Sequence, residues 1–221
     1  MTFSESERRR QEGSLPPRSV VVTFDDGYAS TVRAGPILDR FGFPGTVFVV
    51  TSFVDSQELM SWEGVAHWLS SEHAANMQPL SWPSLGSLVE RGWEIGSHTV
   101  THPRLPFVDD EQLAYELETS RQAIVDRLGS CKSIAYPYGL ANATVAHAAA
   151  RAGYLAGATL SAAHRVDEPL RRPRVGIYAG DTGIRLRAKM SPIVNRTRRM
   201  RTFALLAGAR TRIGVTPVNT R

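Results

Sequence analysis

Cysteine is almost absent from this 221-residue sequence, which contains only Cys131. One cysteine cannot close a disulfide within the chain, so packing alone must hold the fold, as is usual in a reducing compartment. No uninterrupted apolar stretch approaches the roughly 20 residues that a membrane-spanning helix needs. No apolar run follows the arginines at positions 8–10, as it would in a secretory signal. We therefore expect a cytoplasmic protein.

Acidic residues are outnumbered by basic ones, which gives a formal net charge of +5. The excess gathers near the C-terminus, in Arg185, Arg187, Lys189, Arg196, Arg198, Arg199, Arg201, Arg210 and Arg212. No interleaved aromatic residues or DNA-binding motif accompany them, so no nucleic-acid partner is expected. The apolar segment 203–206 among these arginines is compatible with peripheral contact to an anionic membrane. A solvated tail is the alternative interpretation.

The order of apolar segments predicts one α/β domain, for which the chain length is sufficient. Residues 1–18 are polar, and we expect a flexible N-terminal arm there, followed by a domain over 19–192 and a basic tail over 193–221. Apolar, often β-branched runs predict strands over 20–24, 46–50, 93–96, 133–136, 154–159 and 174–177. Helical spacing predicts helices over 30–41, 65–69, 84–91, 109–128, 143–152 and 182–190. This alternation indicates a mainly parallel sheet.

Two adjacent carboxylates, Asp25 and Asp26, follow the first predicted strand and precede Gly27. A turn at the glycine can bring both side chains into one pocket. Crowded carboxylates repel each other, so both stay ionised only when a cation lies close by. A plain turn after a strand is the alternative.

Two histidines, His98 and His102, follow another predicted strand at a spacing of four residues. On a helical turn this spacing places both imidazoles on one side, where they can reach one metal ion. Two unrelated surface histidines are the alternative. His67, His73 and His147 have no motif around them, and we expect them at the surface or in packing.

The segment Tyr136-Pro137-Tyr138-Gly139 ends a third predicted strand. Proline and glycine favour a tight turn that exposes the backbone N–H of Tyr138, and such a donor can stabilise an oxyanion. Turns of this composition are common, so the segment alone is a weak signal.

Taken together and in this order, segments 23–27, 98–102 and 136–139 resemble the first three motifs of the polysaccharide deacetylase family, the chitooligosaccharide deacetylase homology group. The resemblance extends over residues 19–190 and implies a distorted (β/α) barrel of about seven parallel strands. It also implies roles for single residues: Asp25 as general base, Asp26, His98 and His102 as metal ligands, Tyr138 as oxyanion donor, and Pro137 and Tyr138 as substrate-binding residues. Zn²⁺ is the expected metal, and Co²⁺, Ni²⁺ or Fe²⁺ would suit such ligands too. The implied reaction removes N-acetyl groups from an N-acetylated sugar or glycan.

The sequence departs from the family pattern at two positions. Many members carry an arginine where this chain has Ala135, and we hypothesise that Arg174 supplies the guanidinium from another strand. A surface salt bridge of Arg174 is the alternative.

The second departure concerns the general acid. The histidine of the family's Leu-x-His motif, which acts as general acid, has no counterpart in this sequence. His164 is the only histidine after Tyr154 and does not match, and no histidine precedes Asp25. The general acid is therefore unassigned.

Two other functions compete with deacetylation of a sugar. A related metal-dependent amidase would act on a non-sugar cyclic amide, and a non-catalytic glycan-binding protein would keep the metal site alone. The presence of Asp25 argues against a pure binding protein, which has no need of a base beside the metal. Side chains that could stack on sugar rings are Trp62, Trp68, Trp82 and Tyr138, although tryptophan is more often a core residue.

Overall fold

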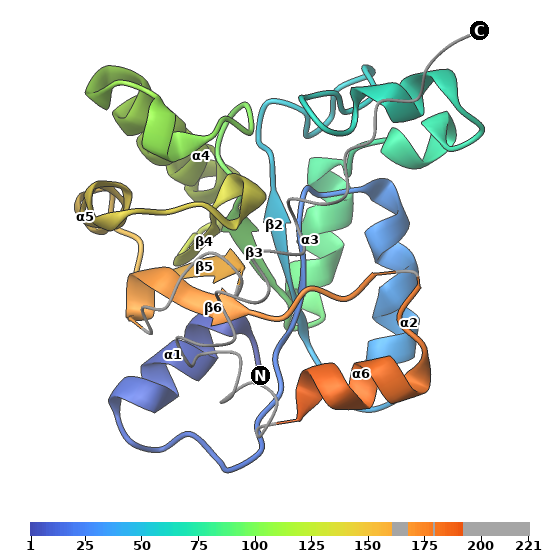
Figure 1. The fold of residues 1–221 in the computed structure, drawn as a ribbon, viewed down its shortest axis with the longest axis vertical. Coiled ribbons are helices and arrows are strands. Elements are labelled where there is room, and N and C mark those ends of the chain that lie inside the picture. The colour runs from blue at the N-terminus through green and yellow to red at the C-terminus, as the bar shows by residue number, and fades with distance from the viewer. Residues whose placement is uncertain (161–167, 179, 192–221) are drawn as a thin grey trace, which may run out of the picture.

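The computed structural model describes residues 1–160, 168–178 and 180–191, and the predicted basic tail over 193–221 lies outside them. A parallel six-stranded sheet in the strand order of the sequence forms the centre of the described part (Figure 1). Its strands are β1 (Val22–Phe24), β2 (Gly45–Val49), β3 (Glu94–Ser97), β4 (Ser133–Ala135), β5 (Ala156–Leu160) and β6 (Arg172–Arg174). The α/β class is confirmed, with six strands in the described residues rather than about seven. The predicted last strand over 174–177 is displaced, because the chain after Arg174 runs out into solvent.

Five of the six α-helices in the described residues overlap predicted helices, and α1 (Phe3–Gln11) was not predicted. The other five are α2 (Ala34–Asp39), α3 (Trp82–Glu90), α4 (Asp110–Leu128), α5 (Ala143–Arg151) and α6 (Gly183–Met190). The 19-residue α4 begins at Asp109, whose side chain accepts the Gln112 N–H, and ends at Gly129 in the left-handed conformation. Both features are the usual signals for the two ends of a helix. None of the helices in the described ranges is long and apolar enough to cross a membrane.

The sheet curls into a partial barrel. In a flat sheet, the first and sixth strands would lie about 24 Å apart, since neighbouring strands are ~4.8 Å apart. Instead the guanidinium of Arg174 on β6 donates a hydrogen bond of 2.9 Å to Thr23 Oγ1 on β1. The two edge strands therefore face each other across a seam that side chains close.

Alternate residues of the strands supply two separate apolar clusters. The larger cluster lies between the sheet and the helices, and Val47, Ile95 and Ile134 contribute to it. The smaller cluster lies on the other, concave face and contains Phe3, Phe48, Ala135, Ala156 and Ala158. Small side chains are required there because the concave space is narrow: a Cβ at Gly96 would lie 2.6 Å from the Phe48 ring.

The prediction of a flexible arm over residues 1–18 is wrong for residues 3–11, which form α1. The Phe3 side chain is 3% exposed and packs edge-on against Phe48 at 5.7 Å between ring centroids. Its N–H donates to Thr46 Oγ1 at the start of β2, and the buried carboxylate of Glu7 accepts from Arg172. One apolar residue in a polar segment anchors the helix, which is why composition gave no sign of it.

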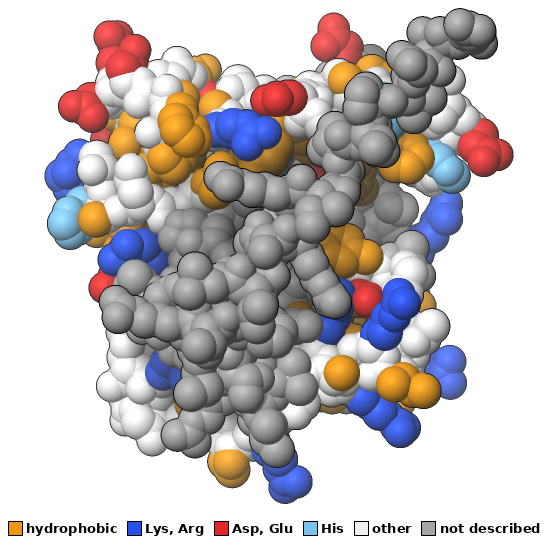
Figure 2. Space-filling model, in the orientation of Figure 1, with side chains coloured by type: hydrophobic (Ala, Val, Ile, Leu, Met, Phe, Trp, Pro, Cys, Tyr) orange, Lys and Arg blue, Asp and Glu red, His pale blue; other side chains and the backbone are white. Residues whose placement is uncertain are grey.

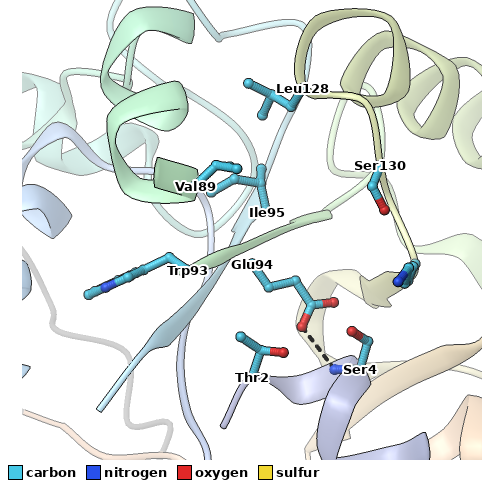
Figure 3. A pocket seen from close by; sticks show the side chains of 9 residues that line it. Thr2, Ser4, Val89, Trp93, Glu94, Ile95, Leu128 and Ser130 are labelled. Carbon is cyan, nitrogen blue, oxygen red and sulfur yellow. Dashed lines mark hydrogen bonds between the residues drawn. The ribbon is translucent and has the colours of Figure 1, made fainter. Parts of the chain in front are cut away.

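A small pocket of about 200 Å³ lies where α1 meets the N-terminal ends of the strands (Figure 3). Within it, Glu94 Oε2 accepts a hydrogen bond of 2.8 Å from the Ser4 N–H. The other oxygen of Glu94 accepts from Ser133 Oγ at 2.6 Å. This carboxylate joins α1, β3 and β4 at the end of the sheet opposite to the candidate site.

Candidate metal-dependent active site

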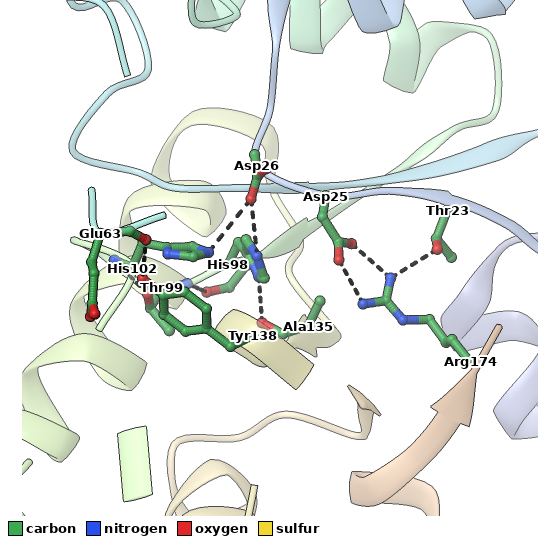
Figure 4. Close-up of polar contacts among 11 residues, drawn as sticks. Thr23, Asp25, Asp26, Glu63, His98, Thr99, His102, Ala135, Tyr138 and Arg174 are labelled. Atoms are coloured by element: carbon green, nitrogen blue, oxygen red, sulfur yellow. Dashed lines mark hydrogen bonds and ion pairs between the residues drawn. The ribbon is translucent and has the colours of Figure 1, made fainter. Parts of the chain in front are cut away.

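The turn after β1 separates the two adjacent carboxylates. Asp26 and Gly27 both have positive φ, at 72° and 87°. A Cβ at Gly27 would lie 3.0 Å from Val49 Cγ1, so glycine suits this turn both in conformation and in space. As a result Asp26 points towards the two histidines, while Asp25 points towards Arg174 (Figure 4).

Asp26, His98 and His102 come together as the sequence predicted. Asp26 Oδ1 lies 3.3 Å from His98 Nε2 and 3.6 Å from His102 Nε2, and both histidines are buried. The candidate ligand atoms of the three residues all lie within 4.8 Å of one another. Two ligands about 2.0–2.1 Å from a tetrahedral zinc ion are separated by roughly 3.3 Å. The spacing is long for hydrogen bonds and fits atoms that share a metal ion.

The protonation of His98 supports the same interpretation. Its Nδ1 lies 2.7 Å from the carbonyl oxygen of Ala135, which makes Nδ1 a donor and leaves Nε2 facing Asp26. Next to a carboxylate, Nε2 either carries a proton, which makes the ring positively charged, or points its lone pair at a bound cation. Although burial lowers the pKa of His98, the carboxylates of Asp26 and Asp25 raise it above its ordinary value. Burial and the charge on His98 lower the pKa of His102 to about 3. The three residues thus favour one positive charge in their centre, and a divalent cation suits that position.

The segment that carries the histidines is a loop and not the helical turn that their spacing suggested. Thr99 and His102 adopt positive φ values of 71° and 65°, which a helix does not contain. The Thr99 side chain accepts the N–H of His102 and closes the loop locally. Both imidazoles still reach Asp26, because the reversed backbone at these two residues turns them to one side.

Arg174 makes a two-pronged ion pair with Asp25, with both N–O distances at 2.7 Å. Burial raises the pKa of Asp25, but the Arg174 guanidinium and the two histidines lower it more, to about 2. Asp25 therefore stays ionised beside the three candidate ligands. The guanidinium reaches it across the seam between β6 and β1, from a strand far away in the sequence.

The turn at Pro137–Gly139 forms one wall of the site. Tyr138 has a φ of 58°, and its ring lies 4.8 Å from the His102 ring, centroid to centroid. Its hydroxyl donates to the carbonyl oxygen of Glu63, while the Arg104 guanidinium covers the ring at 4.3 Å. Pro137 is buried in the same turn.

Trp62, which the sequence suggested as a stacking face for a sugar ring, stacks on the His102 ring at 4.3 Å instead. The sequence gave no indication of two further residues near the site, Glu63 and Tyr28. Glu63, beside Trp62, links this loop to Tyr138. Tyr28 lies next to Asp26. Burial and the neighbouring Asp26 carboxylate both raise the pKa of Tyr28 above its ordinary value. A tyrosine directly after the Asp-Asp-Gly segment was a signal that could have been used.

The remaining tryptophans and histidines lie in different places. Trp68 lines an open pocket of about 320 Å³ together with Tyr28 and Asn76. Trp82 packs instead against the outer core, beneath Arg127. The histidines without a motif, His67, His73 and His147, are all exposed, and the first two contact the Trp68 ring. His164 lies outside the described residues.

Comparison with known proteins gives one family. A sequence model of the polysaccharide deacetylase family matches residues 12–157. Among curated proteins, the poly-β-1,6-N-acetyl-D-glucosamine N-deacetylase of Staphylococcus aureus is 27% identical over 153 residues, covering 64% of this chain and 48% of that protein. The protein of the same name from Staphylococcus epidermidis is 26% identical over 171 residues, covering 72% and 54%. The chain thus spans about half the length of these relatives.

Solved structures show the same likeness. The deacetylase PplD of Streptococcus pyogenes, in complex with acetate, superposes with a TM-score of 0.70 at 25% identity, covering 87% of this chain and 79% of that one. The BpsB deacetylase domain of Bordetella bronchiseptica gives a TM-score of 0.61 at 27% identity, covering 76% and 75%. The curled sheet and its connections are therefore shared with these proteins.

Proposed function

Since this chain belongs to the polysaccharide deacetylase family, we propose that it is a metal-dependent hydrolase that removes N-acetyl groups from a glycan. The observation that carries this proposal is the pairing of two groups at one edge of the sheet. One is the set of three ligand atoms from Asp26, His98 and His102, and the other is the ionised carboxylate of Asp25. A metal site and a base side by side are what hydrolysis of an amide by water needs.

Each residue then has a distinct role. A divalent cation held by Asp26, His98 and His102 would polarise the amide carbonyl and acidify water, and Zn²⁺ suits this donor set best. Asp25 takes the proton from the attacking water, and Arg174 keeps Asp25 ionised and fixed in direction. The backbone N–H of Tyr138 is the proposed donor to the oxyanion that forms on the amide. The group that protonates the leaving amine is not identified among the described residues.

A glycan is the substrate class that the surroundings favour. The curated relatives are named for deacetylation of poly-β-1,6-N-acetyl-D-glucosamine, and the pocket beside Tyr28 contains an exposed tryptophan together with a few polar side chains. Trp68 presents an aromatic face, and Asn76 and Ser30 line the same pocket with hydrogen-bonding groups. A flat aromatic face beside amide and hydroxyl groups suits a sugar ring, which has apolar faces and polar edges.

Acidic and basic side chains are distributed unevenly on the face of the molecule that Figure 2 shows. In Figure 2 most of the visible acidic side chains stand along the upper rim, and Lys and Arg side chains are more frequent in the lower half. Figure 1 places α6, which carries Arg185, Arg187 and Lys189, at the lower right.

Peripheral contact of the basic tail with an anionic membrane stays a proposal, and it depends on residues 193–221.

The test is acetate release from N-acetylglucosamine oligomers, with the metal content determined on the same sample. The control is Asp25→Asn, which keeps the size of the side chain and removes the base. We expect metal-dependent release by the native chain and its loss in Asp25→Asn with the metal retained. Stoichiometric metal without any release would instead favour the non-catalytic glycan-binding protein.

A further inference from the structure

A second buried carboxylate, Glu116 on α4, lies directly behind the loop that carries the histidines. Its side chain is fully buried, and it accepts four hydrogen bonds. Oε2 accepts the backbone N–H groups of Val100 and Thr101 at 2.7 and 2.9 Å, and Oε1 accepts Thr101 Oγ1 at 2.5 Å and Gln112 Nε2 at 2.9 Å. Among the described residues no lysine or arginine pairs with it. All four contacts are donors, so the carboxylate acts solely as an acceptor.

The loop needs such a partner because its conformation is unfavourable by itself. Thr99 and His102, on either side of the two residues that Glu116 holds, have positive φ. For a β-branched residue such as Thr99 this region is a clear outlier, and it persists only where the surroundings enforce it. Two of the loop's backbone N–H groups would also be left without a partner if the carboxylate were removed.

The same helix holds the loop at a second point. Ser120, one turn after Glu116, contacts Ser97 Oγ at 2.7 Å, and that oxygen accepts the Thr99 N–H at 3.0 Å. His98 has a further anchor through its Nδ1 on the Ala135 carbonyl oxygen. The buried Nδ1 of His102 has no hydrogen-bond partner among the described residues. The direction of the His102 ring therefore depends on the loop backbone and on the stacked Trp62 ring.

From these contacts we infer that Glu116 is a positioning residue for the metal site: it locks the strained 98–102 loop in the one conformation that turns both Nε2 atoms towards Asp26. This inference rests on the proposed function only in so far as Asp26, His98 and His102 bind a metal ion. Glutamine has the same shape, but its NH₂ group cannot accept a hydrogen bond, so it can replace only one of the two carboxylate oxygens unless Thr101 and Gln112 reorient.

The test is the affinity for metal, measured by titrating metal-free protein with Co²⁺ and following the visible absorption of the bound ion. For Glu116→Gln we expect Co²⁺ to bind about 10- to 100-fold more weakly, the usual effect of losing a group that orients a metal ligand. The absorption spectrum should also change, because the ligands no longer meet in one geometry. Loss of general stability alone would not change the spectrum of the fully loaded protein.

Glu94→Gln is the matched control. Glu94 is a largely buried carboxylate that also accepts a backbone N–H and a serine hydroxyl, but at the opposite end of the sheet (Figure 3). The Glu94→Gln variant should have a lower melting temperature and a Co²⁺ affinity within about twofold of the native value, since Glu94 touches none of the residues that orient the metal ligands.

Should Glu116→Gln fail to fold, a second variant tests the same contact. Thr101→Val removes only the hydroxyl donor to Oε1 and is expected to weaken Co²⁺ binding by about 2- to 10-fold.

Native-like affinity and an unchanged spectrum in Glu116→Gln would overturn the inference. Equal weakening of Co²⁺ binding in Glu116→Gln and Glu94→Gln would overturn it as well. The loss of affinity would then result from lower stability and not from the misplacement of the metal ligands. If the native protein itself bound no Co²⁺, the proposed function would fail, and that outcome is distinct from the other two.

Discussion

The two ends of the sheet in this protein are built on different principles. At the N-terminal ends of the strands, α1 closes the barrel through Phe3, and Glu94 ties the helix to the sheet with ordinary backbone geometry. At the C-terminal ends lie four of the six non-glycine residues with positive φ in the described ranges: Asp26, Thr99, His102 and Tyr138. Strained residues cluster where side chains must point in directions that regular structure does not provide. The N-terminal end thus contributes packing through α1, and the strained residues of the candidate site lie at the C-terminal end.

The largest loss of activity is expected from Asp25→Asn at the C-terminal end. Removing a general base typically costs about 10²- to 10⁴-fold in rate, and kcat/KM on an N-acetylglucosamine oligomer measures it. The melting temperature should fall as well, because Arg174 loses its charged partner, so the rate is measured on protein that is folded and metal-loaded. A variant that keeps more than half of the native activity would exclude Asp25 as the base.

Phe3→Ala should show the opposite pattern. It empties a buried aromatic site in the concave cluster, and such changes cost about 3–5 kcal/mol of stability. Denaturant unfolding of the metal-loaded protein measures this loss. The Co²⁺ affinity of the folded fraction should be native, because α1 lies at the far end of the strands. Weakened metal binding by the folded fraction would mean that the two ends are coupled after all.

Arg174→Gln should shift the pH dependence of activity. With Arg174 present the pKa of Asp25 is lowered to about 2, and without it burial raises the pKa again. The ionised form is the active one, and a higher pKa means that this form is lost at a higher pH on acidification. The acidic limb of the kcat/KM profile must therefore move to higher pH. Activity should also fall by about 10-fold through the lost alignment of the base. If the acidic limb of the profile did not move, the ion pair of Arg174 with Asp25 would have only a structural role.

Trp68→Ala is expected to have the smallest effect. Loss of a stacking face is worth about 0.5–1.5 kcal/mol, which corresponds to an increase in KM of roughly 2- to 10-fold on an oligomer with kcat unchanged. Trp82→Ala, which removes a tryptophan that packs against the larger core cluster and does not line this pocket, is the control for general destabilisation. If the native protein and Trp68→Ala had equal KM values, the pocket beside Tyr28 would not bind the substrate.

Local sequence patterns predicted most of the strands and helices, and they also identified the three candidate metal ligands. They failed where one contact, or a segment distant in the sequence, determines the structure. Three ordered segments at strand ends were enough to indicate Asp26, His98 and His102. The anchoring of α1 by Phe3 was missed, because one apolar residue in a polar segment leaves no periodic signal. The left-handed loop at Thr99 was missed as well, since the two-histidine spacing fits a helix equally well. Glu116 looks like any charged residue of an amphipathic helix until its four donors are seen.

Reconstitution with metal tests the central claim most directly. The native chain is stripped of metal with a chelator, titrated back with Zn²⁺, and assayed at each step for acetate release from an N-acetylglucosamine oligomer. The account predicts no activity in the stripped protein, a linear return of activity up to one equivalent of Zn²⁺, and no return in Asp26→Asn. Full activity in the metal-free protein, or equal recovery in Asp26→Asn, would contradict it.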